Sequence, residues 1–308
     1  MPNGFQRFLS GGISFRPRLD PFIVWKGNLG RMYGDSSRSL ICGGAGAAIS
    51  PQEAAAAASR LPGRISFYCK DLQTGSTASF RAEESLCAAS VIKLAVLTEA
   101  FFRIEEGFLD PHEEYVLRAE DKLPSCGAFT YMHEGLRVTM EDLYTAMIIH
   151  SDNTATNILL HRFGMEAVNR RMRSLGLSIT TVNRLLFDGE AAARGLENQI
   201  SAGEMAFLLE KMYKGELVSP KASKEMLQIL KNQRLNGKIP FFLHGMGVPV
   251  AHKTGEDDGI THDVGIVYGS SPFILCFCGN NTDVPLFERF MQDMSLGIYR
   301  WFQGTHNA

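Results

Sequence analysis

The order of strand-like and helix-like segments constrains the fold of this chain more than any other feature. Two short strands are predicted near the start, at Arg64–Cys69 and Ser76–Phe80, joined by a turn at 73–76. Three more are predicted near the end, at Val248–Lys253, Asp263–Gly269 and Pro272–Gly279. The last of these is apolar on both faces, which is typical of a central strand covered from two sides. The pattern therefore predicts one sheet built from both ends of the chain.

The segment between these strands has the periodicity of helices. Apolar residues recur at three- and four-residue steps in six predicted helices: Leu94–Ile104, Met140–Ile149, Thr154–Phe163, Glu166–Leu175, Ala202–Tyr213 and Lys221–Asn232. A capping box from Ser50 to Glu53 opens an earlier helix, and a last helix carries an apolar stripe from Phe287 to Phe302. The sequence thus predicts an α+β fold: an antiparallel sheet of N- and C-terminal strands, flanked by helices, with an all-helical inserted subdomain. A cleft is expected where the sheet and the insertion meet.

Residues 1–48 differ in composition from the rest. They carry six Lys and Arg residues against two acidic residues, a local charge of +4, and show no sustained hydrophobic periodicity. No uninterrupted apolar segment follows a basic start, so we expect no signal peptide. We interpret residues 1–48 as a poorly ordered N-terminal extension, with a functional tail as the alternative. Residues 49–308 are expected to form one domain, with a sheet subdomain at about 49–82 plus 248–308 and a helical subdomain at about 83–247.

Composition argues against several functional classes. The formal net charge is −2 and 45% of the 308 residues are hydrophobic, so a nucleic-acid partner is not expected. No segment reaches the roughly 18 consecutive apolar residues of a membrane helix. The six cysteines include no C-x-x-C pair and the eight histidines no metal-binding pair, so we expect no metal and no cofactor. Cys276 and Cys278 would share one face of a strand and are interpreted as buried thiols.

Ser90 and Lys93 form the first pattern with chemical meaning. Ser90 precedes the helix predicted from Leu94, and the unpaired N–H groups of a helix N-terminus favour negative charge on a reacting oxygen. Lys93 follows three residues later on the same face, among apolar neighbours. Burial lowers the pKa of a lysine and makes its amine a usable general base. The alternative is a helix-capping serine followed by a solvent-exposed lysine.

Two later motifs complete the pattern. Ser151-Asp152-Asn153 follows an apolar helix and, taken alone, would be interpreted as a helix cap. Lys253-Thr254-Gly255 closes the strand predicted at Val248–Lys253. There a lysine and a threonine suit a substrate carboxylate, and a glycine permits close approach of a ligand. Ser-x-x-Lys, Ser-Asp-Asn and Lys-Thr-Gly, in this order, are the signature of class A β-lactamases and penicillin-binding proteins.

From about residue 50 to 303 the chain resembles the class A β-lactamase and β-lactamase-like serine hydrolase family. The motifs begin 61 and 102 residues apart, which is close to the family spacing. Ser125-Cys126-Gly127 resembles a family loop at the cleft mouth, and His262–Gly265 resembles the strand after the third motif. The resemblance implies a monomer that acts on a small-molecule β-lactam or a related amide or ester.

The resemblance also implies a role for each motif residue. Ser90 would be the acylated nucleophile, with Lys93 and Ser151 as its proton-transfer partners, and Asp152 would tie down a loop. The backbone N–H groups of Ser90 and Glu256 would form the oxyanion hole. The substrate would be bound by Ser125, Asn153, Lys253, Thr254 and Gly255.

The match breaks between the second and third motifs. Class A enzymes carry a glutamate there, in an E-x-x-x-N arrangement, that activates the water releasing the acyl-enzyme. No glutamate in 184–201 has an asparagine four residues on, and the position expected to align with the catalytic glutamate is near Leu186. Glu190 is the nearest substitute, Asp188 is next, and Glu197 is interpreted as a surface charge. Because losing a positioned base costs on the order of 10²–10⁴ in rate, the sequence supports acylation more strongly than fast hydrolysis.

Three functions remain open at this point. The leading one is a serine hydrolase that opens the β-lactam amide through an acyl-Ser90 intermediate. The missing E-x-x-x-N favours, as an alternative, a penicillin-binding-protein-like peptidase or esterase with slow deacylation. A non-catalytic β-lactam or muropeptide binder is the third. The family implies a periplasmic or secreted protein, which conflicts with the expected lack of a signal peptide, so the localisation is left unassigned.

Overall fold

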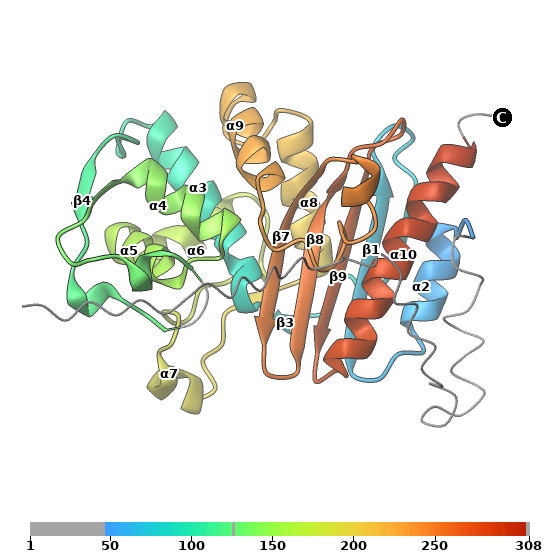
Figure 1. Ribbon diagram of the computed structural model, residues 1–308, viewed down its shortest axis with the longest axis horizontal. Helices are drawn as coiled ribbons and strands as arrows, with labels where there is room; N and C mark the ends of the chain where they lie inside the picture. Colours follow the sequence, from blue (N-terminus) through green and yellow to red (C-terminus); the bar gives the residue numbers. More distant parts are fainter. Residues whose placement is uncertain (1–46, 125–126, 306–308) are drawn as a thin grey trace, which may run out of the picture. The chain divides into compact units, whose positions relative to one another are not determined.

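The computed structural model describes residues 47–124 and 127–305. Its centre is a five-stranded antiparallel sheet with the order β2-β1-β9-β8-β7 (Figure 1). The strands are β1 (Arg64–Asp71), β2 (Thr77–Phe80), β7 (Val250–Asp257), β8 (Ile260–Val267) and β9 (Phe273–Asn280). The predicted α+β fold, with a sheet drawn from both ends of the chain, is confirmed. The segment predicted as a central strand is β9, which pairs with β1 on one side and β8 on the other.

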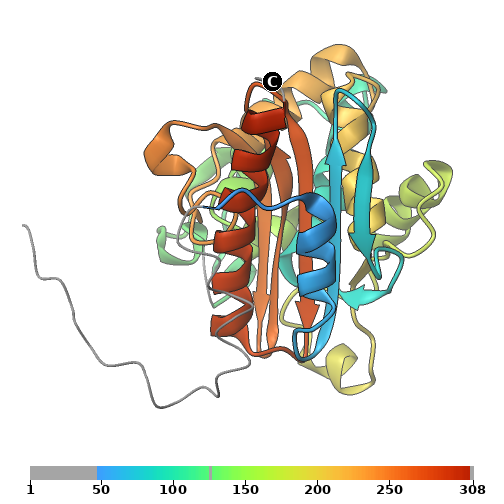
Figure 2. The same ribbon diagram turned by 90° about the vertical axis from the view of Figure 1, so that its right-hand side faces the viewer.

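Alternate residues of β9 enter two different hydrophobic cores. One face of the sheet is covered by α2 (Pro51–Ala58) and α10 (Val284–Thr305), as Figure 2 shows. The opposite face packs on the helical region, which is the part of the chain between β2 and β7, and mainly on its helix α8 (Ala202–Tyr213). Cys276 and Cys278 both lie in this second core as fully buried free thiols, and burial raises their pKa values well above the ordinary range. Their prediction as buried core thiols is confirmed.

The helical region contains all six helices that the periodicity predicted. Their bounds agree with the predictions to within one residue: α3 (Lys93–Glu105), α4 (Met140–Ile149), α5 (Asn153–Phe163), α6 (Met165–Ser174), α8 (Ala202–Tyr213) and α9 (Pro220–Lys231). The capping box of α2 is also present, since the Ser50 N–H donates to Glu53 Oε2 at 2.8 Å and Ser50 Oγ accepts from the Glu53 N–H at 3.2 Å.

Short elements that were not predicted connect these helices. The pairs β3 (Leu86–Cys87) with β6 (Gln199–Ile200), and β4 (Glu114–Val116) with β5 (Arg137–Thr139), are too brief to give a periodic pattern. A five-residue helix α7 (Gly189–Ala193) and four 3₁₀ turns complete the described elements. The 3₁₀ turns are η1 (Ala89–Ile92), η2 (Ala119–Asp121), η3 (Phe129–Tyr131) and η4 (His244–Met246).

The strand predicted at Val248–Lys253 is shifted and longer in the structure. β7 runs on to Asp257, where it pairs with Ile260 of β8, so Lys253-Thr254-Gly255 lies inside the strand and not at its end. The hairpin partner β8 continues the hydrogen-bond ladder past Gly255, pairing Glu256 with Thr261 and Asp257 with Ile260. β7 is the edge strand beside the helical region (Figure 1), which places the third motif at the junction of the two parts.

Some predictions fall on residues outside the described ranges. The N-terminal extension lies there except for Ala47 and Ala48, as does Ser125 at the predicted cleft mouth. In residues 47–124 and 127–305, no helix combines the length and the apolar character needed to cross a membrane. The division of 49–308 into a sheet subdomain and a helical subdomain stays a prediction.

Candidate active site

A cleft of about 360 Å³ lies at the junction of β7 with the helical region. All three motifs reach it, because Ser90, Ser151, Asn153 and Thr254 are among its lining residues. The segment 184–198 forms the facing wall and contributes side chains of both charge signs. The cleft that was expected at the junction therefore exists, and its lining includes Ser90, Ser151, Asn153, Thr254 and Glu256.

The turn that carries Ser90 is fixed from below. Ser90 lies in η1, which leads directly into α3, and the preceding Ala89 has a φ of +41°, a strained value for a residue with a Cβ atom. Cys87, just before this turn, is held through its backbone: its N–H donates to Asn280 Oδ1 at 2.9 Å, and its carbonyl accepts from His262 Nε2 at 2.8 Å. Two side chains of the sheet, Asn280 of β9 and His262 of β8, thus hold the strained turn in place.

His262 is held in one tautomer by these contacts. The Gly279 N–H donates to its Nδ1 at 3.0 Å, so the ring proton is on Nε2 and points at the Cys87 carbonyl. His262 is fully buried, and burial lowers its pKa to about 4. The imidazole is therefore neutral at neutral pH and links β8 to the turn that carries Ser90.

Lys93 has no exposed surface and contacts Ser90, which lines the cleft. Its Nζ is 2.9 Å from Ser90 Oγ and 3.0 Å from Ser151 Oγ. It also contacts the Ser151 carbonyl and Asn153 Oδ1, both at 2.7 Å. The predicted burial of Lys93 is confirmed, and the alternative of a solvent-exposed lysine is wrong. These contacts place Lys93 Nζ within hydrogen-bond distance of both hydroxyl groups, Ser90 Oγ and Ser151 Oγ.

Ser151 connects the second motif to the third. Its Oγ lies 3.0 Å from Lys93 Nζ and 3.0 Å from Lys253 Nζ, and its φ of +54° is again unusual for a non-glycine residue. Lys253 is fully buried and also donates to the Thr254 carbonyl at 2.7 Å. The four side chains of Ser90, Lys93, Ser151 and Lys253 therefore form one continuous chain of hydrogen-bonding contacts.

Asp152 ties down the backbone at Ala128 and Phe129, which agrees with its predicted role of holding a loop. It caps α5 by accepting from the Ala155 N–H at 2.9 Å, and its other oxygen accepts from the N–H groups of Ala128 and Phe129 at 2.7 and 2.9 Å. Gly127 has a φ of +124°, and a Cβ atom there would lie 2.5 Å from Asp152 Oδ2. Only glycine fits between this loop and the carboxylate.

Gly255 permits a close approach within the protein itself. A Cβ atom at this position would lie 3.1 Å from Val91 Cγ2 and 3.3 Å from the Ala88 carbonyl, so β7 packs directly against η1. Glu256, the next residue, lines the cleft together with Ser90. Its carboxylate pairs with Lys238 Nζ at 2.8 Å, and the buried Lys238 also donates to the Gly255 carbonyl.

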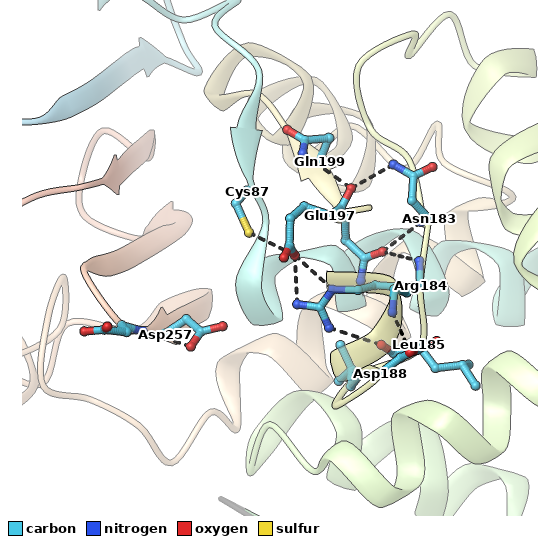
Figure 3. A network of polar contacts seen from close by, with 12 residues as sticks. Cys87, Asn183, Arg184, Leu185, Asp188, Glu197, Gln199 and Asp257 are labelled. Carbon is cyan, nitrogen blue, oxygen red and sulfur yellow. Dashed lines mark hydrogen bonds and ion pairs between the residues drawn. The ribbon is translucent and has the colours of Figure 1, made fainter. Parts of the chain in front are cut away.

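An ion pair joins the two ends of segment 184–198 (Figure 3). Arg184 donates to Glu197 Oε2 at 2.9 and 2.8 Å, and the Cys87 thiol contacts the same oxygen at 3.6 Å. Asn198 Oδ1 accepts from the N–H groups of Asn183 and Arg184 at 2.8 and 3.0 Å. The interpretation of Glu197 as a surface charge is wrong: it is half-buried, ion-paired and lines the cleft.

Three positions in this segment were considered for the water-activating residue: Leu186, Asp188 and Glu190. Leu186 lines the cleft, and Asn157 holds its backbone in both directions, accepting from its N–H at 2.9 Å and donating to its carbonyl at 3.0 Å. Asp188 also lines the cleft and caps α7 by accepting from the Ala191 N–H at 2.9 Å. Glu190 is exposed and is not among the lining residues described for the cleft.

Several supporting residues were missed at the sequence level. Asn157 and His262 stood in segments that were noted, but nothing in the sequence assigned their partners. Lys238 and Asn280 were not noted at all. The signal that points to His262 is a polar residue inside an apolar strand. In residues 47–124 and 127–305, no group of three or more His, Cys, Asp or Glu side chains is placed to hold a metal ion.

Comparison with known proteins agrees with this geometry. Residues 51–302 match the beta-lactamase enzyme family. The beta-lactamase ROB-1 of Haemophilus influenzae is 27% identical over 207 residues, which cover 66% of this chain and 67% of that protein. Among solved structures, a beta-lactamase from Sphaerobacter thermophilus superposes with a TM-score of 0.76 and 27% identity, covering 84% of this chain and 98% of its own.

A structure of PBP-A superposes almost as well. Its TM-score is 0.75 at 26% identity, with 82% of this chain and 96% of that chain covered. The family match spans nearly the whole described region, from the first helix to the last, and includes the three motifs that line the cleft. The chain therefore belongs to the beta-lactamase enzyme family, as its motifs predicted.

Proposed function

We propose that this protein opens the β-lactam amide through a covalent acyl-Ser90 intermediate. The observation that supports this proposal is the unbroken set of contacts from Ser90 Oγ to Lys93 Nζ, Ser151 Oγ and Lys253 Nζ, with distances of 2.9, 3.0 and 3.0 Å. A nucleophile, a base within hydrogen-bond reach and a second proton carrier are the parts that acyl transfer requires.

Acylation would proceed through a series of proton transfers. In its neutral form, the Lys93 amine takes the hydroxyl proton of Ser90 while Oγ attacks the lactam carbonyl carbon. The N–H groups of Ser90 and Glu256 stabilise the oxyanion that forms. As the lactam C–N bond breaks, Lys93 returns the proton through Ser151, whose own hydroxyl proton passes to the departing nitrogen. Lys253 and Thr254 hold the substrate carboxylate throughout.

The binding assignments follow the same geometry. Asn153 lines the cleft and is proposed to bind the substrate amide. Gly255 keeps its proposed substrate-binding role on the resemblance alone, because Val91 and Ala88 fill the space beside it. Ser125 keeps its proposed place at the cleft mouth on the resemblance alone. For the water that releases the acyl group, Glu190 and Asp188 are the proposed bases. The lining position of Asp188 and the exposure of Glu190 support Asp188 as the better candidate.

A second candidate function is a penicillin-binding-protein-like acylation with slow release. The observation that favours it is Leu186, an apolar side chain where the family pattern leads us to expect the water-activating glutamate. A structure of a leucine-to-glutamate mutant of PBP-A, 25% identical to this chain, holds an acyl-enzyme with penicillin G. Covalent penicillin binding therefore occurs on a similar scaffold.

Intact-protein mass spectrometry over time with benzylpenicillin tests both candidates. We expect one penicillin adduct per chain, and none in Ser90→Ala. The matched control is Ser85→Ala, because Ser85 is exposed and lies outside the described cleft lining. An adduct that clears quickly, with nitrocefin turnover, supports the hydrolase, whereas a persistent adduct supports slow release. Neither adduct nor turnover would contradict both, and binding that survives Ser90→Ala would favour a non-catalytic binder.

The same assay identifies the releasing base. Glu190→Gln and Asp188→Asn each remove one carboxylate and keep the shape of the side chain. The variant whose adduct persists longer identifies the group that activates water. If the adduct lifetime is the same in both variants and the unchanged protein, neither carboxylate has this role.

A further inference from the structure

The charges on the cleft walls are not used by the proposed acylation chemistry. Besides the motif residues, the lining includes one arginine and four acidic residues: Arg184, Asp188, Glu197, Glu256 and Asp257. Two of the carboxylates are neutralised, Glu197 by Arg184 and Glu256 by Lys238, each at 2.8 Å. Asp188 and Asp257 form no ion pair with any residue in the described part of the chain. Among the described lining residues, Asp188 and Asp257 therefore carry negative charges that no ion pair offsets.

These two carboxylates come from different walls. Asp188 stands on the segment 184–198, and Asp257 ends β7, two residues beyond Gly255; Figure 3 shows them on separate segments. Each carboxylate accepts a hydrogen bond from a neutral backbone N–H group at 2.9 Å, Asp188 from Ala191 and Asp257 from Asp258. Such bonds fix the side chains and leave their charges in place.

The position of the charges relative to a bound substrate follows from the proposed function. With the reacting carbonyl at Ser90 and the carboxylate at Lys253, the side chain beyond the amide held by Asn153 extends between segment 184–198 and the end of β7. A cleft with one sign of charge and low-dielectric walls attracts the opposite charge and repels its own. An anionic side chain would meet repulsion here, and a cationic one attraction.

We propose that Asp188 and Asp257 select substrates that carry an ammonium group on the side chain beyond the reacting amide. The inference rests on the proposed acyl-Ser90 chemistry and names the substrate class of that site. The preferred substrate is a zwitterion: its carboxylate is held at the buried Lys253, and its ammonium lies between the two acidic walls. Partly exposed charge pairs of this kind are worth about two- to fivefold each in binding.

Three penicillins that differ mainly in side-chain charge provide the test. Ampicillin carries an ammonium, benzylpenicillin is neutral and carbenicillin carries a carboxylate. The second-order rate constant of acylation is measured for each by intact-protein mass spectrometry. The readout is the ampicillin-to-carbenicillin ratio compared between variants, because the intrinsic reactivities of the drugs then cancel.

Asp188→Asn and Asp257→Asn remove the charges singly and together, and asparagine at 188 remains a good helix cap. We expect the double variant to lower the ratio about tenfold, and high salt to lower it in the unchanged protein. Asp258→Asn is the matched control, because Asp258 is an exposed carboxylate next to Asp257 that is not among the described lining residues. It should leave the ratio unchanged.

The outcomes separate this inference from the function on which it rests. Adducts with all three penicillins and a ratio that the double variant does not change would overturn the selection by Asp188 and Asp257 alone. A ratio that falls equally in Asp258→Asn would also overturn it, because the effect would then be general surface charge. No adduct with any of the three would contradict acylation itself.

Discussion

The cleft lies between two walls that differ in the contacts that hold them and in the side chains that they expose. The motif wall is built around Ser90, Lys93, Ser151 and Lys253, and the facing wall is segment 184–198. On the motif wall, Lys93 and Lys253 are fully buried, and both contact the Ser151 hydroxyl from different elements. The facing segment 184–198 is fixed through its backbone and its base but presents Phe187 at 50% exposure and Leu196 at 43%. In the motif wall, mutual contacts fix the positions of the polar side chains. In the facing wall, Asn157 fixes the backbone of Leu186 but not its side chain.

This difference bears on the side chain at position 186. Asn157 holds the backbone of residue 186 and makes no use of its side chain. A different side chain at 186 would therefore occupy the same place in the cleft. The motif wall has no such freedom, because each of its polar side chains is a partner of another.

The largest expected effect comes from breaking the motif wall at Lys93. Lys93→Met keeps the length of the side chain and removes the amine that receives the Ser90 proton, so acylation should slow by about 10²–10⁴-fold. The rate is measured by adduct formation with benzylpenicillin. Lys224→Met is the control, since Lys224 is exposed on α9. Retained acylation in a folded Lys93→Met protein would rule out Lys93 as the base.

A second prediction concerns the buried support of the motif wall, His262. Its pKa is about 4 in the folded protein against an ordinary 6.5, because burial disfavours the charged ring. Between these values the unfolded chain binds a proton that the folded protein does not, so stability is full above pH 6.5 and falls as the pH drops toward 4. The loss should be about 3 kcal/mol.

Urea unfolding at pH 7 and pH 4 measures this loss. His262→Asn should be less stable at pH 7 but should lose about 3 kcal/mol less on acidification than the unchanged protein. His161→Asn is the control, because His161 is exposed on α5 and should leave the pH dependence as it was. Equal pH dependence in all three proteins would show that His262 is not the group responsible.

A third prediction concerns the side chain at position 186 of the facing wall. Leu186→Glu places a carboxylate in the cleft at a backbone position that Asn157 already fixes, so the penicillin adduct should clear about 10²-fold faster. Leu196→Glu is the matched control, an exposed leucine of the same segment outside the described lining. If both variants release the adduct at the original rate, the identity of residue 186 does not limit release.

The sequence predicted the motif wall better than the facing wall, for a physical reason. Helix periodicity and motif order are local signals, so α4 and α8 were predicted to the residue, and Ser90, Lys93 and Ser151 were correctly brought together. The pairs Arg184–Glu197 and Asn157–Leu186 join residues 13 and 29 apart with no periodic pattern between them. Such pairings depend on how the loop folds back, which composition does not reveal.

The smallest expected effect tests how closely β7 must approach the nucleophile turn. In Gly255→Ala the new Cβ atom would lie 3.1 Å from both Val91 Cγ2 and His262 Cδ2, so these neighbours must move by a few tenths of an ångström. Because Ser90 and the Glu256 N–H stand on the two surfaces that are pushed apart, we expect acylation to slow by up to about tenfold, with less effect on adduct lifetime.

Gly245→Ala provides the control for this last prediction, because nothing lies within 4 Å of a Cβ atom built at Gly245. It should leave the acylation rate unchanged. If Gly255→Ala instead alters the adduct lifetime and leaves acylation intact, the close packing of β7 on η1 serves the release of the acyl group. The assignment of acylation to the motif wall and of acyl release to the facing wall would then be wrong, because the motif wall would control both acylation and release.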